Sequence, residues 1–162
     1  MSSPRSPAPV VKSYEVTFFV LYGEIILRDP WCDAGDDGEA YRDAQGQVAG
    51  ASTYQISVRP LVTSQPTKLE LRIWDAEPES PEGSWDGCRQ LELHMPTGEL
   101  FVEVHTVPAM VTTELPGGPG VYGVRVYRGR YDGVEKFLID MWWRAVLPPA
   151  DDDEDFYGDS WS

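Results

Sequence analysis

The sequence lacks the features that carry a chain into or across a membrane. No window approaches the roughly 18 uninterrupted apolar residues that a membrane-spanning helix needs. The opening segment, MSSPRSPAPVVK, has no apolar stretch of about 7 to 15 residues followed by small residues, which is the pattern of a secretory signal. We therefore expect a soluble, cytoplasmic protein in which residues 1–12 form a flexible Pro/Ser leader.

Cysteine and histidine are scarce, with two of each. Without an export signal, Cys32 and Cys88 are expected to be reduced thiols. Neither the CxxC nor the HExxH spacing of zinc sites occurs, and no G-x-S-x-G elbow or phosphate-binding glycine loop is present. We therefore expect a protein that is not an enzyme and needs no cofactor or metal.

Basic residues are also few. The chain has 13 bases against 27 acids, a formal net charge of -14, and six of the acids lie in the last twelve residues. Such a charge repels nucleic acid and anionic membranes, and it accelerates encounters with basic proteins. The composition argues against direct nucleic-acid or membrane binding and favours a basic protein as partner.

Alternation of apolar and polar residues dominates the chain between residues 13 and 144, as expected for strands with one buried face. Short strands divided by turns at 96–98 (PTG) and 116–120 (PGGPG) predict an all-β fold, an antiparallel β-sandwich at 13–147, with long acidic loops and an acidic C-terminal tail at 148–162. The predicted inward residues are Tyr14, Val16, Phe18, Val20, Tyr22, Tyr54, Ile56, Val58, Leu69, Leu71, Ile73, Leu91, Leu93, Met95, Leu100, Val102, Val104, Tyr122, Val124, Val126, Phe137, Ile139, Met141 and Trp143.

A hairpin around 96–98 can be placed in register with Met95 facing Leu100, which pairs every apolar residue with another. Its opposite face then sets Glu92 against Glu103, and like charges directly opposite each other destabilise a sheet by a few tenths of a kcal/mol. Either the register is wrong, or both side chains splay into solvent, or they form an acidic face for basic groups of a partner. In the last strand, Trp142 is predicted to point outward, beneath the tail or a loop, or at a partner interface.

Two long acidic segments, 28–52 and 76–87, interrupt the strand pattern and are candidate functional loops. The first resembles a calcium loop, in which Asp33, Asp36, Asp37 and Asp43 would be the ligands. However, Ala44 stands where the pattern requires a bidentate Glu, so a solvated acidic loop is favoured over a calcium site.

Several fragments, in order, resemble the bacterial competence protein J family of DNA-entry nuclease inhibitors. They are YEVTFFV, DPWCDAG, GASTYQISVRP, TELPGGPGVYGVRVY and EKFLIDMWW, and they run from about Tyr14 to Trp143. The resemblance consists of strand patterns, a Trp-x-Asp at 31–33 and a Leu-Pro before a Gly-x-Tyr strand. It implies an inhibitor that occupies the basic surface of a nuclease and performs no chemistry.

The sequence thus predicts a non-enzymatic acidic binding protein, an inhibitor or immunity-type partner of a basic protein such as a nuclease. Two alternatives remain, namely a scaffolding module that self-associates or recruits proteins, and a calcium- or ligand-binding sandwich. Acids that would steer the encounter, and aromatic residues that would anchor it, are Trp31, Asp33, Asp36, Asp37, Trp85, Glu92, Glu103, Trp142, Asp151, Asp152, Asp153, Glu154, Asp155, Phe156, Tyr157 and Trp161.

Overall fold

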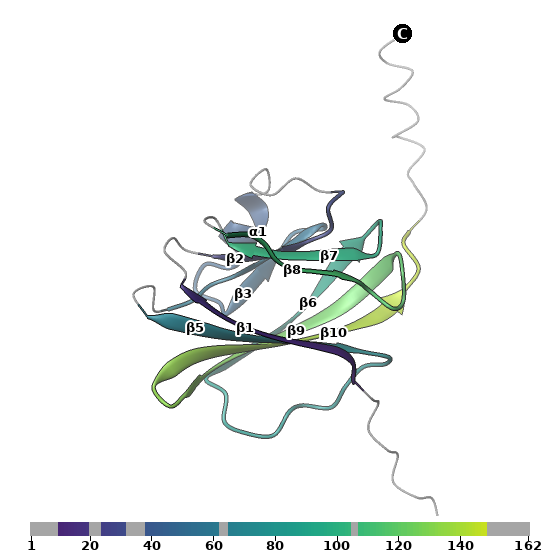
Figure 1. Ribbon diagram of the computed structural model, residues 1–162. Coiled ribbons are helices and arrows are strands. Elements are labelled where there is room, and N and C mark those ends of the chain that lie inside the picture. Colours follow the sequence, from purple (N-terminus) through teal and green to yellow (C-terminus); the bar gives the residue numbers. More distant parts are fainter. Residues whose placement is uncertain (1–9, 20–23, 32–37, 62–64, 105–106, 149–162) are drawn as a thin grey trace, which may run out of the picture.

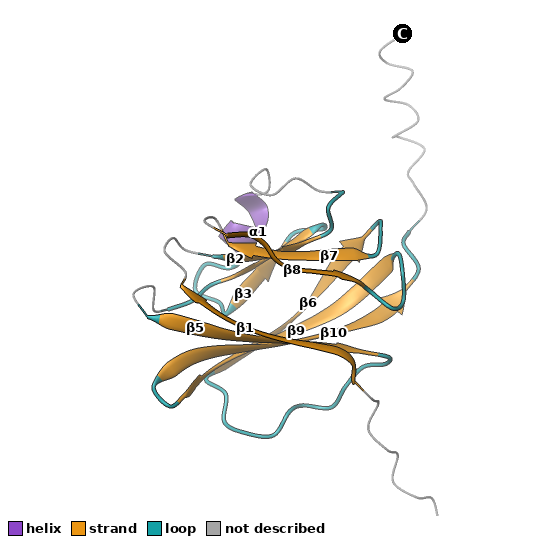
Figure 2. Ribbon diagram, in the orientation of Figure 1, coloured by secondary structure: helices purple, strands orange, loops and turns teal. Residues whose placement is uncertain are grey.

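The fold is all-β, as the sequence predicts. The computed structural model of the 162-residue chain describes residues 10–19, 24–31, 38–61, 65–104 and 107–148. Within these residues, ten strands form two five-stranded sheets that stack face to face, and one six-residue helix, α1 (Gly38–Asp43), lies beside the second sheet (Figures 1 and 2).

The first sheet has the strand order β1-β5-β10-β9-β6, and the second has the order β3-β4-β2-β7-β8. All pairings are antiparallel except that of β5 with β10, which is parallel. The strands of the first sheet are β1 (Val10–Phe19), β5 (Pro66–Trp74), β10 (Val134–Ala145), β9 (Gly120–Tyr131) and β6 (Gly87–Met95). Those of the second are β3 (Ala49–Ala51), β4 (Gln55–Val58), β2 (Ile25–Arg28), β7 (Glu99–Val104) and β8 (Val107–Glu114).

The core fills the space between the sheets and consists of the inward residues of both. Strand β5 shows the predicted alternation. Leu69, Leu71 and Ile73 are at most 2% exposed, whereas the side chain of Lys68 is on the opposite face of the strand and is exposed to water. The same agreement holds for the predicted inward residues of β4, β6, β7 and β9 and for Phe137, Ile139 and Met141 of β10. Tyr14 and Val16 are partly buried against this core, and Val20 and Tyr22 lie outside the described residues.

The predicted hairpin of β6 with β7 is wrong. The two strands belong to different sheets, because the segment 96–98 carries the chain across the sandwich: β6 pairs with β9, and β7 pairs with β2 and β8. Their apolar residues belong to the same core but come from opposite sheets. Glu92 therefore lies opposite Gly123 and Glu103 opposite Ile26, so the two acids do not oppose each other.

Strand β10 departs from simple alternation because both of its faces are covered. Leu138, Asp140 and Trp142 point away from the core, as predicted, yet none is more than 3% exposed. Trp143, predicted inward, is instead 37% exposed and lies where the pairing with β9 shifts register. The cover of the outer face comes from the loop 75–86, which Figure 1 shows running along the side of the first sheet away from the second.

Gly123 makes room for the buried Trp142 ring on this outer face. A Cβ atom at Gly123 would lie 2.4 Å from the Trp142 ring carbons Cε2 and Cζ2. We expect Gly123→Ala to lower the free energy of unfolding by about 2 to 3 kcal/mol, since the indole must shift out of a packed site. Denaturant titration measures this. Gly87→Ala is the control, because its Cβ would meet nothing closer than 3.5 Å; equal losses in both variants would contradict the packing argument.

Candidate partner-binding surface

A row of charged side chains crosses the outer face of the first sheet. Asp140 of β10 lies opposite Arg72 of β5 on one side and opposite Arg125 of β9 on the other. Its carboxylate is fully buried and accepts hydrogen bonds from Arg72 Nε (2.9 Å) and Nη2 (3.1 Å) and from Trp74 Nε1 (2.9 Å). A buried charge needs such partners because desolvation is costly. These hydrogen bonds therefore join β10 to β5 on the outer face of the sheet.

Arg125 attaches the loop 75–86 to this row. Its guanidinium donates to the carbonyl oxygen of Pro78 (3.0 Å) and to Glu77 Oε2 (2.8 Å), and it lies 4.8 Å from the Trp142 ring centroid. The far end of the loop is held by the Asp86 amide, which donates to the Arg128 carbonyl at 2.8 Å. The loop is thus fastened at both ends to β9.

Besides Glu77, which is exposed but paired with Arg125, the loop presents four exposed carboxylates, which we call the loop acids: Asp75, Glu79, Glu82 and Asp86. The segment contains no Lys or Arg. Since its ends are fixed, these charges are held over one face of the molecule, and they form an acidic surface that a basic partner would encounter.

A partly exposed aromatic cluster, formed by Trp31, Tyr54 and His94, lies at the other end of β6. The Trp31 and Tyr54 ring centroids are 4.9 Å apart, and the Tyr54 ring meets the His94 ring edge-on at 6.0 Å. Trp31 is 61% exposed. Its position is set by Asp29, whose buried carboxylate accepts hydrogen bonds from the backbone amides of Trp31 (2.8 Å) and Thr97 (2.8 Å). The ring is therefore presented by a well-fixed turn, as an interface anchor requires.

The residues predicted to bind a partner differ in their exposure. Trp31 and Glu92 are exposed, and Glu92 accepts a hydrogen bond from Arg144 at 3.2 Å. Trp85 is half-buried, 5.5 Å from the Tyr127 ring centroid. The predicted exposure of Glu103 is wrong, since it is 8% exposed and paired with Arg28 at 2.7 Å. Trp142 is 2% exposed beneath Arg125, which is held by the loop 75–86, so of the placements that the sequence left open the structure has burial beneath a loop.

The remaining predicted residues lie outside the described residues. They are Asp33, Asp36, Asp37, Asp151, Asp152, Asp153, Glu154, Asp155, Phe156, Tyr157 and Trp161. Conversely, the sequence singled out neither His94 nor the individual loop acids, and it predicted Tyr54 to point inward, whereas the ring is half-buried against Trp31. The sequence could have indicated the loop acids, since they lie in a segment that interrupts the strand pattern and contains no basic residue. It could not have indicated the contact of Tyr54 with Trp31, because that contact forms only in the folded chain.

Two candidate reactive or metal-binding side chains, Cys88 and Asp43, have shifted pKa values. Although the Cys88 side chain is exposed, partial desolvation raises the pKa of its thiol, which lowers the thiolate fraction at neutral pH. A hydrogen bond from the Ala51 amide, aided by Arg89, lowers the pKa of Asp43, which is already paired with Arg89 at 2.9 Å. In the described part of the chain no three His, Cys, Asp or Glu side chains are grouped as metal ligands would be. It also contains no helix with the length and apolar character of a membrane span.

The fold and this surface describe a β-sandwich that presents fixed acids and aromatic rings. No protein-family model matches the sequence, and no curated protein matches it. Two solved structures share the fold. One is ComJ from Bacillus subtilis, an inhibitor of the DNA-degrading activity of NucA, with a TM-score of 0.65 and 13% identity over 85% of this chain and 98% of that one.

The other solved structure is that of the protein called crocagin biosynthetic gene J, which has a TM-score of 0.57 and 13% identity over 86% of this chain and 97% of that one. The resemblance to the competence protein J family that the sequence fragments indicated is therefore confirmed at the level of fold.

Proposed function

We propose that this chain is a non-enzymatic protein that binds a basic protein, such as a nuclease, and occludes its DNA-binding cleft. The observation that carries the proposal is the shared fold with ComJ, which spans 98% of that inhibitor. The acidic composition supports it independently, because a DNA-cleaving protein must offer a positively charged surface to its substrate. Occlusion needs shape and charge but no catalytic group.

In this proposal the loop acids and the aromatic cluster around Trp31 have different roles in binding. The loop acids raise the rate of encounter through long-range attraction, whereas the Trp31 ring supplies buried contact area once the proteins meet. Asp86 and His94 lie at opposite ends of β6, about 26 Å apart at the usual rise of a strand. Both therefore fit within one interface of standard size, which buries about 800 Å² on each partner.

The test is a DNA-degradation assay with the basic nuclease that co-purifies with the chain from its host. We expect stoichiometric inhibition that weakens as salt is raised, because screening removes the attraction between exposed charges. Inhibition should leave the DNA itself unbound. A nuclease that stays fully active at a molar excess of the chain contradicts the proposal, as does inhibition through sequestration of DNA.

Trp31→Ala tests the anchor. Removing a ring that is 61% exposed should leave folding intact but weaken binding of the inhibited nuclease at least about 10-fold, mainly through faster dissociation. Surface plasmon resonance separates the two rates. Leu61→Ala is the matched control, since Leu61 is 68% exposed and lies outside the aromatic cluster. If the two variants bind alike, Trp31 is not part of the interface.

A further inference from the structure

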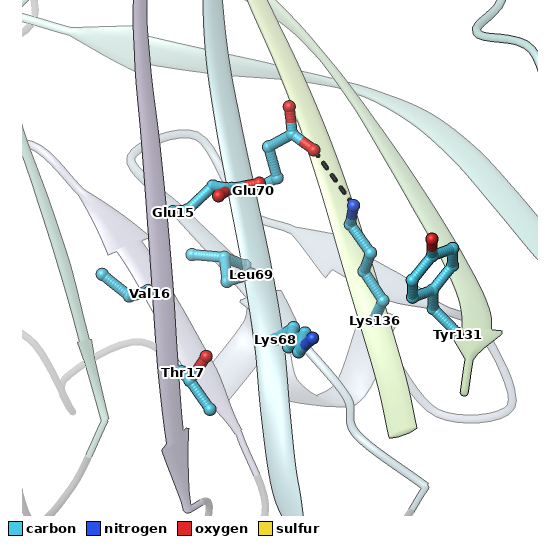
Figure 3. A pocket seen from close by; sticks show the side chains of 8 residues that line it. All are labelled: Glu15, Val16, Thr17, Lys68, Leu69, Glu70, Tyr131 and Lys136. Carbon is cyan, nitrogen blue, oxygen red and sulfur yellow. Dashed lines mark ion pairs between the residues drawn. The ribbon is translucent and has the colours of Figure 1, made fainter. Parts of the chain in front are cut away.

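Two adjoining hollows lie on the outer face of the first sheet, near the turn between β9 and β10. The first has a volume of about 340 Å³ and the second, between this turn and the loop 75–86, about 390 Å³. Tyr131 and Lys136 line both, so the hollows share a wall. Each volume falls within the range of small-molecule sites. Figure 3 shows the first hollow, with Lys136 turned toward Glu70 and the Tyr131 ring beside it.

The second hollow is shaped to receive a flat ring. Trp85 and Tyr131 both line it, and Tyr131 is 63% exposed although its ring is large and apolar. Gly129 also lines it, and a Cβ atom there would lie 3.0 Å from the Trp85 ring, so the glycine lets this ring lie close against β9. Aromatic rings stack favourably against such walls.

The first hollow carries an unpaired charge of each sign. Lys136 and Glu70 neutralise each other through an ion pair of 3.1 Å. Glu15 lies directly opposite Glu70, and Lys68 lies directly opposite Lys136, so each has a like charge as its neighbour. Neither Glu15 nor Lys68 forms an ion pair with any described residue. Like charges side by side on a sheet are unfavourable, and a ligand of opposite charge relieves each of them.

Lys68 lies near the wall that the two hollows share. Its ammonium lies 6.0 Å from the Tyr131 ring centroid, at the shared wall, and the Lys136 ammonium lies at the same distance. Glu15 and Lys68 are diagonal neighbours on adjacent strands, which places their Cβ atoms about 7 to 8 Å apart. An ammonium and a carboxylate carried on one carbon atom fit between side chains at that separation.

We propose that the two hollows form one site for a zwitterionic aromatic molecule of the size of an aromatic amino acid. Its ring lies against Trp85 and Tyr131, its carboxylate meets Lys68, and its ammonium meets Glu15. The site lies at the end of the first sheet opposite to the Trp31 cluster, because Lys136 is near the start of β10, whereas Trp142, at the level of Glu92, is near its end. It is therefore separate from the aromatic anchor of the proposed partner interface.

Isothermal titration calorimetry with three matched probes tests the charges one at a time. The probes are phenylalanine, N-acetylphenylalanine, which lacks the cation, and phenylalaninamide, which lacks the anion. We expect phenylalanine to bind at least 5-fold more tightly than either derivative. Equal binding of all three, or no binding of phenylalanine in the millimolar range, overturns the proposal. Preference for a derivative also overturns it, and indicates a peptide C-terminus or N-terminus as the ligand instead.

Two variants assign each charge to its side chain. Glu15→Gln should weaken phenylalanine and phenylalaninamide but not N-acetylphenylalanine, whereas Lys68→Met should weaken phenylalanine and N-acetylphenylalanine but not phenylalaninamide. Glu114→Gln, an exposed acid on the second sheet, is the control and should change nothing. Uniform weakening of all three probes by either variant contradicts the assignment. Inhibition by the Glu15 and Lys68 variants should be unchanged, so this test and that of the proposed function can fail independently.

Discussion

Asp140→Ala should lower the free energy of unfolding by about 3 kcal/mol, because it leaves the Arg72 guanidinium and the Trp74 indole N–H without their shared acceptor. The Asp140 side chain is fully buried, and that of Arg72 is only 21% exposed, so water replaces the lost carboxylate incompletely. Denaturant titration at neutral pH measures the loss. The same variant should loosen the attachment of the loop 75–86, since Arg125, which holds the loop, loses the negative charge that lies opposite it on β10.

Glu92→Ala is the matched control, because it breaks the ion pair with Arg144, in which both side chains are about half exposed. Pairs of that kind contribute about 0.5 kcal/mol or less. A loss in Asp140→Ala as small as in Glu92→Ala would show that the buried row does not hold the sheet together. Replacing Asp140 with Leu and Arg72 with Met together should recover part of the stability, since no unpaired charge then remains.

Neutralising the loop acids with Asn and Gln should slow association with the inhibited nuclease about 10- to 100-fold at low ionic strength. The acids are exposed and fixed over one face by Arg125, so they act on the partner before contact. Dissociation should change far less. Stopped-flow measurements over a series of salt concentrations should show a flatter salt dependence for the neutralised protein, because fewer charges remain to be screened.

The control replaces four acids elsewhere, namely Glu39, Glu99, Glu114 and Asp132, by their amides. The net charge of the protein changes equally in both variants, so only the placement of the charge differs. If the two variants associate at the same rate, net charge alone steers the encounter and the loop has no special role.

The strand faces were predictable because burial on one side of a sheet imposes a two-residue period. In β5 the three inward residues and the outward Lys68 are placed correctly from the sequence. The fold class follows from such strands and the glycine-rich turns between them, and the order of the fragments indicated the fold shared with ComJ.

Strand pairing was not predictable in the same way. The period places Leu93 and Val102 on buried faces, but it does not tell whether they share a sheet or meet across the core. The turn 96–98 suggested the nearest partner, whereas Leu93 pairs with Tyr122, far along the chain. The error carried over to Glu103, which was expected on an acidic face and is instead paired with Arg28.

The candidate site was predicted only in part, because exposure depends on what lies above a strand. Trp142 points outward as expected, yet Arg125 and the loop 75–86 cover it, and no local pattern reveals that cover. Trp31 was identified from its place in an acidic loop. Its ring contact with Tyr54 joins two turns, and a contact of that kind has no signature in the sequence.

The position of β10 has a consequence for biosynthesis. It is the last described strand to leave the ribosome, yet it lies in the middle of the first sheet, between β5 and β9. Until it arrives, the β1–β5 pair and the β6–β9 pair each present an unprotected edge and half of a core. A nascent chain at that stage is vulnerable to aggregation and to chaperone capture, and its folding must be slow because the closing contacts join distant segments.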